Sequence, residues 1–156
     1  MTSAWRLVKR RHAGAAFDGE GASAYGGRWN SVGVRMVYTS QSAALAALEV
    51  LVGVQKAGLL AAYDLIEARF REALVEVIES RQLPEAWWRH PPSAATQALG
   101  DRWVREGRSP VLRVPSAVIR TEHNFLLNPV HPDFGSIEIG VAHPFEFDAR
   151  LGASHG

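Results

Sequence analysis

Cysteine is absent from this 156-residue sequence. That absence excludes a disulfide scaffold, a thiolate metal site and a cysteine nucleophile. Long hydrophobic runs are missing as well. The N-terminus carries no apolar stretch of signal-peptide length, and no segment approaches the ~18 continuous apolar residues of a membrane span. We therefore expect a soluble, cytoplasmic protein that does not act on or in a membrane.

Charged residues are scarce too. They make up 21% of the chain, and 17 Lys+Arg against 16 Asp+Glu leave a formal net charge of +1. Because duplex binding depends largely on surplus cations, this balance argues against direct binding of nucleic acid. The hydrophobic share of 47% is typical of a globular protein. A charge inside an apolar stretch therefore requires a specific explanation.

The length suits one domain spanning residues 1–156, because no repeat or linker divides the chain. Strands are expected on both sides of two helices without regular βαβ alternation, which favours an α+β fold. We expect strands over residues 4–8, 34–38, 60–66, 73–78, 111–114, 117–120, 136–141 and 145–147, and helices over 42–56 and 93–106. Residues 13–33 are expected to form a long glycine-rich loop of the kind that often carries function.

Glu49 is the first candidate functional residue. It is the only charged residue between Ala43 and Val54, in a helix so uniformly apolar that we expect it to be buried. An ionised carboxylate in such surroundings costs several kcal/mol unless it meets a partner or ligand. The alternative that Glu49 lies on one solvent-facing stripe of the helix stays open.

Arg28 is the second candidate, in the segment Gly26-Gly27-Arg28-Trp29-Asn30. Paired glycines allow a tight turn and a close approach of the backbone to a ligand, and the guanidinium fork suits phosphate or carboxylate. The alternative is a tight turn whose surface arginine stacks on Trp29. The segment matches neither a Walker loop nor a Rossmann fingerprint.

Ser116 is the third candidate. It follows Pro115, which interrupts an apolar strand-like run and indicates an edge or a bulge. No G-x-S-x-G motif surrounds it, so we expect its hydroxyl to bind a ligand rather than to act as a hydrolase nucleophile. The histidines show no metal-ligand spacing, and no metal site is predicted. Trp87 and Trp88 are interpreted as core or interface residues.

Several segments in order resemble the RES domain, a family named for an Arg, a Glu and a Ser. They cover most of the chain: Trp5-Arg6, Gly26 to Ser31, Val37 to Ser40, Ala46 to Glu49, Gly100-Asp101, Val114 to Ser116, Asn124 to Pro129, His131 to Phe134 and Pro144 to Leu151. Each segment alone is weak, but their number and order make the joint match specific.

The resemblance implies a toxin of the Xre–RES type II toxin–antitoxin modules. Its fold would be a mixed sheet with flanking helices, similar to ADP-ribosyltransferases. Its activity would be depletion of NAD+ by cleavage of the nicotinamide–ribose bond, through hydrolysis or phosphorolysis. Carried over by residue, the NAD+ site would comprise Arg6, Arg28, Tyr38, Glu49 and Ser116, with Arg28, Glu49 and Ser116 catalytic.

The resemblance also implies partners. They are NAD+ as substrate, phosphate as a possible co-substrate, a DNA-binding Xre-type helix-turn-helix antitoxin and a second copy of the chain in a homodimer. No cofactor beyond the substrate is implied. Two other functions stay open: mono-ADP-ribosylation of a target protein, and a binding module that holds a nucleotide without consuming it.

Overall fold

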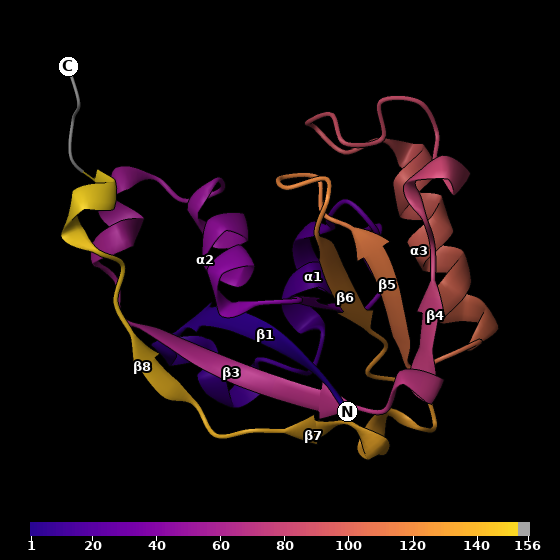
Figure 1. Cartoon of the computed structure of the whole chain (residues 1–156), viewed down its shortest axis with the longest axis horizontal. Helices are drawn as coiled ribbons and strands as arrows, with labels where there is room; N and C mark the ends of the chain where they lie inside the picture. The colour runs from indigo at the N-terminus through magenta and orange to yellow at the C-terminus, as the bar shows by residue number, and fades with distance from the viewer. Residues whose placement is uncertain (153–156) are drawn as a thin grey trace.

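A strongly curled sheet forms the frame of the computed structural model, which describes residues 1–152 (Figure 1). Its strands run β4-β5-β6-β2-β1-β3-β7, with β8 also paired to β3. Neighbouring strands are antiparallel except for the parallel pair β4–β5, so the sheet is mixed and the expected α+β class is confirmed. The strands are β1 (Thr2–Lys9), β2 (Val37–Ser40), β3 (Tyr63–Phe70), β4 (Val75–Val77), β5 (Val111–Pro115), β6 (His123–Leu127), β7 (Glu138–Ile139) and β8 (His143–Phe145).

The helices flank this sheet. They are α1 (Glu20–Tyr25), α2 (Ala43–Leu51) and α3 (Ala94–Glu106), and short 3₁₀ turns connect other elements. Figure 1 shows α2 over β1 and β3, and α3 alongside β4 and β5. The boundaries of α3 agree with the sequence prediction. The Ser93 hydroxyl accepts a hydrogen bond from the Thr96 amide, and Gly107 ends the helix with φ of 60°, a left-handed conformation that glycine adopts at little cost.

Helix α2 differs from its prediction in two ways. It ends at Leu51 rather than at residue 56, because Val52, Gly53 and Val54 are poor helix formers. It is also not buried all round. Leu45 and Ala46 are buried, whereas other positions are half-buried or exposed to solvent, because the sheet covers one face of the helix. The expectation of a wholly buried helix is therefore wrong.

The region between β5 and β6 was also predicted wrongly. Residues 117–120 form a turn rather than a strand, and the amides of Val118 and Ile119 donate to the Ser116 hydroxyl at 3.1 Å each. A side chain that hydrogen-bonds nearby amides offers the backbone an alternative to a strand ladder. The next strand is β6, which begins at His123. The sequence analysis did not predict a strand there.

Other boundaries shift by a few residues. The expected strand over 34–38 lies at Val37–Ser40, and that over 60–66 lies at Tyr63–Phe70. The expected loop over 13–33 contains α1 and the end of a 3₁₀ turn. The strands expected over 4–8, 73–78, 111–114 and 136–141 are found with altered ends, and the last one moves from 145–147 to His143–Phe145.

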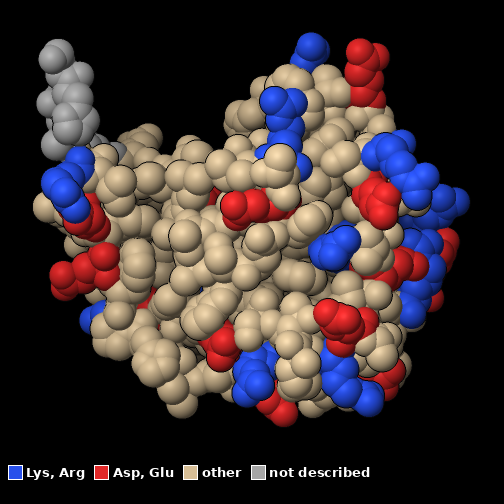
Figure 2. Space-filling model, viewed as in Figure 1, with Lys and Arg blue, Asp and Glu red and all other residues tan. Residues whose placement is uncertain are grey.

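The hydrophobic core fills both sides of the central strands. One cluster packs Trp103 of α3 against β5 and β6, and another packs α2 against β1 and β3. Charged side chains gather where α3 and β4 lie, and the middle of the face seen in Figure 2 carries few of them. Within residues 1–152, no helix is long and apolar enough to cross a membrane.

Candidate active site

A cavity of about 260 Å³ lies between α2 and strands β1, β2 and β6. Its wall is formed by Trp5, Arg6, Leu7, Tyr38, Thr39, Ser40, Ala46, Glu49, Val50 and Asn124. Three of the predicted site residues, Arg6, Tyr38 and Glu49, are therefore brought together from separate parts of the chain. Ala46, Glu49 and Val50 reach the cavity together because positions three and four apart share one face of a helix.

Glu49 is half-buried and fixed through one of its two carboxylate oxygens. The Ser116 hydroxyl and the Asn124 side-chain amide donate to Oε1 at 2.7 and 2.8 Å. Hydrogen bonds to a charged group contribute about 1.5–3 kcal/mol each, which offsets the cost of partial burial. Within residues 1–152, no hydrogen bond ends on Oε2. Glu49 is thus a held carboxylate on a cavity wall rather than a side chain on a fully wet stripe.

Ser116 lies behind Glu49 and is fully buried. Its hydroxyl donates to Glu49 and accepts from the backbone amides of Val118 and Ile119. A direct contact between this hydroxyl and a ligand, as expected from the sequence, would have to replace one of these three hydrogen bonds. Ser116 is positioned to orient the carboxylate and to close the β5–β6 turn.

Tyr38 lines the cavity, and its hydroxyl is held by two hydrogen bonds. The hydroxyl donates to Asn30 Oδ1 at 2.6 Å and accepts from the Trp29 amide at 3.0 Å. Burial raises the pKa of Tyr38, and the hydrogen bond from the Trp29 amide opposes that rise only in part. Gly27 passes so close that a Cβ there would lie 2.6 Å from the Tyr38 hydroxyl oxygen. Gly27 therefore makes room for the tyrosine.

Arg6 forms part of the wall between this cavity and a second hollow of about 390 Å³. Its guanidinium donates to the carbonyls of Ala16 (2.6 Å) and Tyr38 (2.9 Å). Burial lowers the pKa of Arg6 to about 10, partly opposed by the charge of Asp18. Within the described residues, no carboxylate lies within 4.0 Å of this guanidinium. A buried cation without an ion-pair partner favours an anionic ligand.

Arg28 does not line the cavity. Its Nη1 donates to the carbonyls of Trp87 and Arg89 at 2.8 Å each, so it holds the segment before α3. Burial lowers the pKa of Arg28, and the nearby Glu49 carboxylate opposes this shift.

Trp29 is buried against Trp87, with ring centroids 6.1 Å apart. Trp87 is thus a core residue, whereas Trp88 is partly exposed.

Asn124 and Ser40 complete the site and had not been predicted as functional residues. Asn124 is 9% exposed and Ser40 4% exposed, and both line the cavity. The signal that could have identified Asn124 is an amide directly before the apolar run Phe125-Leu126-Leu127. Among residues 1–152, no group of three or more His, Asp or Glu side chains is placed to hold a metal ion.

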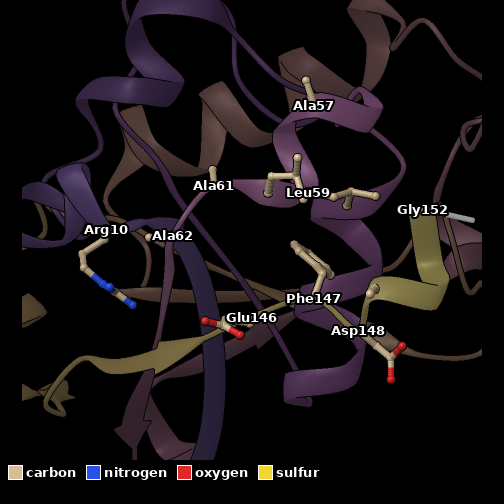
Figure 3. A pocket seen from close by; sticks show the side chains of 11 residues that line it. Arg10, Ala57, Leu59, Ala61, Ala62, Glu146, Phe147, Asp148 and Gly152 are labelled. Atoms are coloured by element: carbon tan, nitrogen blue, oxygen red, sulfur yellow. The ribbon is translucent and has the colours of Figure 1, made fainter.

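A larger hollow of about 770 Å³ lies elsewhere, between residues 57–62 and the C-terminal segment that follows β8. Figure 3 shows Leu59 and Phe147 beside this space, with Arg10 and Glu146 farther along its wall. Arg10 is already paired with Asp64 at 3.0 Å. The smaller cavity is the stronger candidate for an active site, because polar groups converge in it around a held carboxylate.

Comparison with known proteins agrees with the fold. Toxin Res of Yersinia enterocolitica serotype O:8 is 35% identical over 148 residues, which cover 94% of this chain and 97% of that protein. The Prs ADP-ribosylating toxin of Sphingobium sp. is 35% identical over 155 residues, 96% of each chain. The structure also resembles a chain of the M. tuberculosis MbcT–MbcA toxin–antitoxin complex, with a TM-score of 0.77, 20% identity and coverage of 93% of this chain and 84% of that one. Residues 3–148 match the RES domain, and the chain belongs to the RES domain family.

Proposed function

We propose that this protein is the toxin of a toxin–antitoxin pair and that it cleaves the nicotinamide–ribose bond of NAD+. The observation that carries the proposal is the Glu49 carboxylate, which is anchored through Oε1 on the wall of a small cavity. The relatives named Toxin Res, which match nearly the whole chain, support the toxin assignment.

The shape of the site suits one end of a dinucleotide. A cavity of about 260 Å³ is smaller than the ~300–1,000 Å³ typical of sites for drug-sized ligands. It therefore suits the nicotinamide riboside end of NAD+, with the cationic ring against Tyr38. The diphosphate would lie on the Arg6 guanidinium, which borders both hollows, and the adenosine end would extend into the second one. Arg28 is not part of the cavity wall, but it lies near enough to Glu49 to feel its charge, and its Nη1 would stabilise the segment at residues 87–89.

The proposed reaction needs electrostatic stabilisation from the protein and no general acid. The bond between the ribose C1 and the ring nitrogen breaks, its electron pair leaves with nicotinamide, and nicotinamide departs neutral. Positive charge develops on the ribose, as in other glycosyl cleavages. The Glu49 carboxylate would stabilise that charge through Oε2. Water then adds its oxygen to C1 and releases a proton, giving ADP-ribose, or phosphate adds instead and gives ADP-ribose 1″-phosphate.

Incubation of the purified chain with NAD+, with and without phosphate, tests the proposal. We expect loss of NAD+ with stoichiometric release of nicotinamide. Free ADP-ribose identifies hydrolysis, and ADP-ribose 1″-phosphate identifies phosphorolysis. Binding of NAD+ with no loss of it in either buffer would contradict the proposal and would favour a non-catalytic nucleotide-binding module.

Mono-ADP-ribosylation of a protein is the second candidate, and it is favoured by the Sphingobium relative, which is named an ADP-ribosylating toxin. The same held carboxylate would serve, since only the acceptor differs. NAD+ labelled in the adenylate half separates the two functions. Label retained on a protein after denaturation indicates transfer, whereas label recovered as a small molecule indicates hydrolysis or phosphorolysis.

We further propose that the chain acts in the cytoplasm as a homodimer and is held inactive by an Xre-type helix-turn-helix antitoxin. The similarity to a chain from a toxin–antitoxin complex supports an antitoxin partner. Co-expression with the protein encoded beside it, followed by size-exclusion chromatography with light scattering, tests both the partner and the stoichiometry. A monomer that binds no helix-turn-helix protein would contradict this part of the proposal.

A further inference from the structure

The amide of Asn124 is itself held in one orientation. Ser40 of β2 and Asn124 of β6 face each other as an antiparallel pair, so their side chains lie on the same face of the sheet. The Ser40 hydroxyl donates to Asn124 Oδ1 at 2.8 Å. That contact uses the carbonyl end of the amide and turns the NH₂ end, Nδ2, toward Glu49 Oε1 at 2.8 Å. Both side chains are almost completely buried, so water has little access to compete for these bonds.

The hydrogen bonds from Ser40 to Asn124 and from Asn124 to Glu49 form a relay. This relay acts on one carboxylate oxygen only. Ser116 approaches Oε1 from the turn between β5 and β6, and Asn124 approaches it from β6. Oε2 has no hydrogen-bond partner among residues 1–152. A carboxylate with one donor can rotate about it, whereas two donors on the same oxygen fix the plane of the group. We propose that Asn124, oriented by Ser40, is a positioning residue that aims Glu49 Oε2 at the reacting ribose. This inference rests on the proposed cleavage of NAD+.

The relay predicts an effect on turnover rather than on binding. In Asn124→Ala, Glu49 keeps its charge and its bond from Ser116 but loses its fixed direction. A small misplacement of a catalytic group can cost up to about 10²-fold in rate, so we expect kcat to fall about 10–100-fold with KM unchanged. In Ser40→Ala the amide of Asn124 is free to turn, and a smaller fall in kcat is expected. Because Ser40 acts through Asn124, the double variant should be no slower than Asn124→Ala alone.

Asn128 provides a matched control. It is a buried asparagine just beyond the other end of β6, where its Oδ1 accepts from the Val130 amide, and it does not line the cavity. Asn128→Ala should lose stability and keep the wild-type kcat. Asn124→Asp is isosteric and keeps the oxygen that accepts from Ser40, so it is the second variant to test if the alanine variant does not fold. It should also lose turnover, because a carboxylate at this position repels Glu49 rather than donating to it.

The experiment is a steady-state assay of NAD+ consumption by the full chain. It compares the wild type with Asn124→Ala, Ser40→Ala, their combination, Asn124→Asp and the control Asn128→Ala. A wild type that consumes no NAD+ would overturn the proposed function and this inference with it. If the wild type turns over, three results would overturn the positioning role alone: an unchanged kcat in Asn124→Ala and Asn124→Asp, a rise in KM as the main effect, or losses that multiply in the double variant. An equal loss of kcat in Asn128→Ala would also overturn it, because the effect would then follow from damage to β6.

Discussion

The Ser116 hydroxyl lies 2.7 Å from Glu49 Oε1 and is completely shielded from solvent. This contact joins two residues that lie 67 positions apart in the chain. The two residues have different positions relative to the cavity. Glu49 reaches the cavity, whereas Ser116 holds Glu49 from behind and closes the turn between β5 and β6.

Ser116→Ala should therefore reduce turnover more than substrate binding. We expect kcat to fall about 10–100-fold with little change in KM, because the carboxylate loses a donor but the cavity wall is unaltered. The freed amides of Val118 and Ile119 should cost about 1 kcal/mol in unfolding free energy. Initial rates and urea unfolding measure the two effects. Ser109→Ala is the matched control, since Ser109 bridges Trp103 and Val111 away from the site and should affect stability only.

Glu49→Gln should fold normally and lose most turnover. The glutamine carbonyl can still accept from Ser116 and Asn124, so the local hydrogen bonds survive the change. The negative charge that would stabilise the ribose cation is lost, and removal of one such electrostatic group costs about 10²–10³-fold in kcat. Thermal unfolding and NAD+ consumption are the measurements, with the exposed Glu138→Gln as control. Wild-type turnover in Glu49→Gln would exclude the carboxylate from the chemistry.

Glu49 could be predicted from the sequence because a lone carboxylate in an apolar helix is a local signal. The boundaries of α3 could be predicted for the same reason, since its caps at Ser93 and Gly107 lie at its own ends. Asn124 and Ser40 are different. Their contact depends on the register of β2 against β6, which joins segments 84 positions apart. No nearby residue specifies that register, so periodicity could not reveal it.

The contacts of Ser116 and Arg28 also depend on tertiary structure. We expect the Ser116 hydroxyl to bind a ligand because it follows Pro115 in an apolar run, but the residue types do not show that local amides and Glu49 hydrogen-bond to that hydroxyl. The guanidinium of Arg28 suits an anion, and one of its nitrogens, Nη1, donates to two backbone carbonyls. In both cases the chemical capacity was evident from the sequence, and the partner was set by tertiary structure.

Gly27→Ala should be strongly destabilising. A Cβ at this position would lie 2.6 Å from the Tyr38 hydroxyl oxygen and 3.0 Å from Asn30 Oδ1, so the hydrogen-bonded pair must move. Overpacking of this kind costs about 1–3 kcal/mol. Gly14→Ala is the control, because nothing lies within 4 Å of the added methyl group. Urea unfolding of the two variants measures the difference, and equal stabilities would contradict the close packing around Tyr38.

Arg28→Lys should loosen the segment that contains Trp87 and Arg89. A lysine keeps the charge but lacks the guanidinium Nη1, which donates to both carbonyls at 2.8 Å from a fixed plane. We expect faster hydrogen exchange at residues 87–89 and an increase of up to about tenfold in KM, equivalent to about 1.4 kcal/mol. Arg35→Lys, which alters an exposed pair with Glu20, should change neither quantity. An unchanged exchange pattern in Arg28→Lys would show that the segment is held by other contacts.

Tyr38→Phe should change how stability depends on alkaline pH. Burial raises the pKa of Tyr38 in the folded state above its unfolded value of about 10. The unfolded chain therefore releases this proton first as the pH rises. The contribution of Tyr38 to stability is complete below about pH 10, and above that pH it is lost by up to about 1.4 kcal/mol per pH unit.

The wild type should accordingly lose stability between about pH 10 and 11 more steeply than Tyr38→Phe. At neutral pH the variant should be the less stable protein, because it lacks the hydrogen bonds to Trp29 and Asn30. Urea unfolding at a series of pH values measures the free energy of unfolding of both proteins. Ionisable groups common to the two proteins cancel when one free energy is subtracted from the other. Tyr25→Phe removes an 88% exposed hydroxyl and should retain the wild-type slope. Parallel curves of unfolding free energy against pH for the wild type and Tyr38→Phe would mean that the Tyr38 hydroxyl reaches water in the folded protein. The tyrosine would then not be fixed beside the cavity by its hydrogen bonds to Trp29 and Asn30.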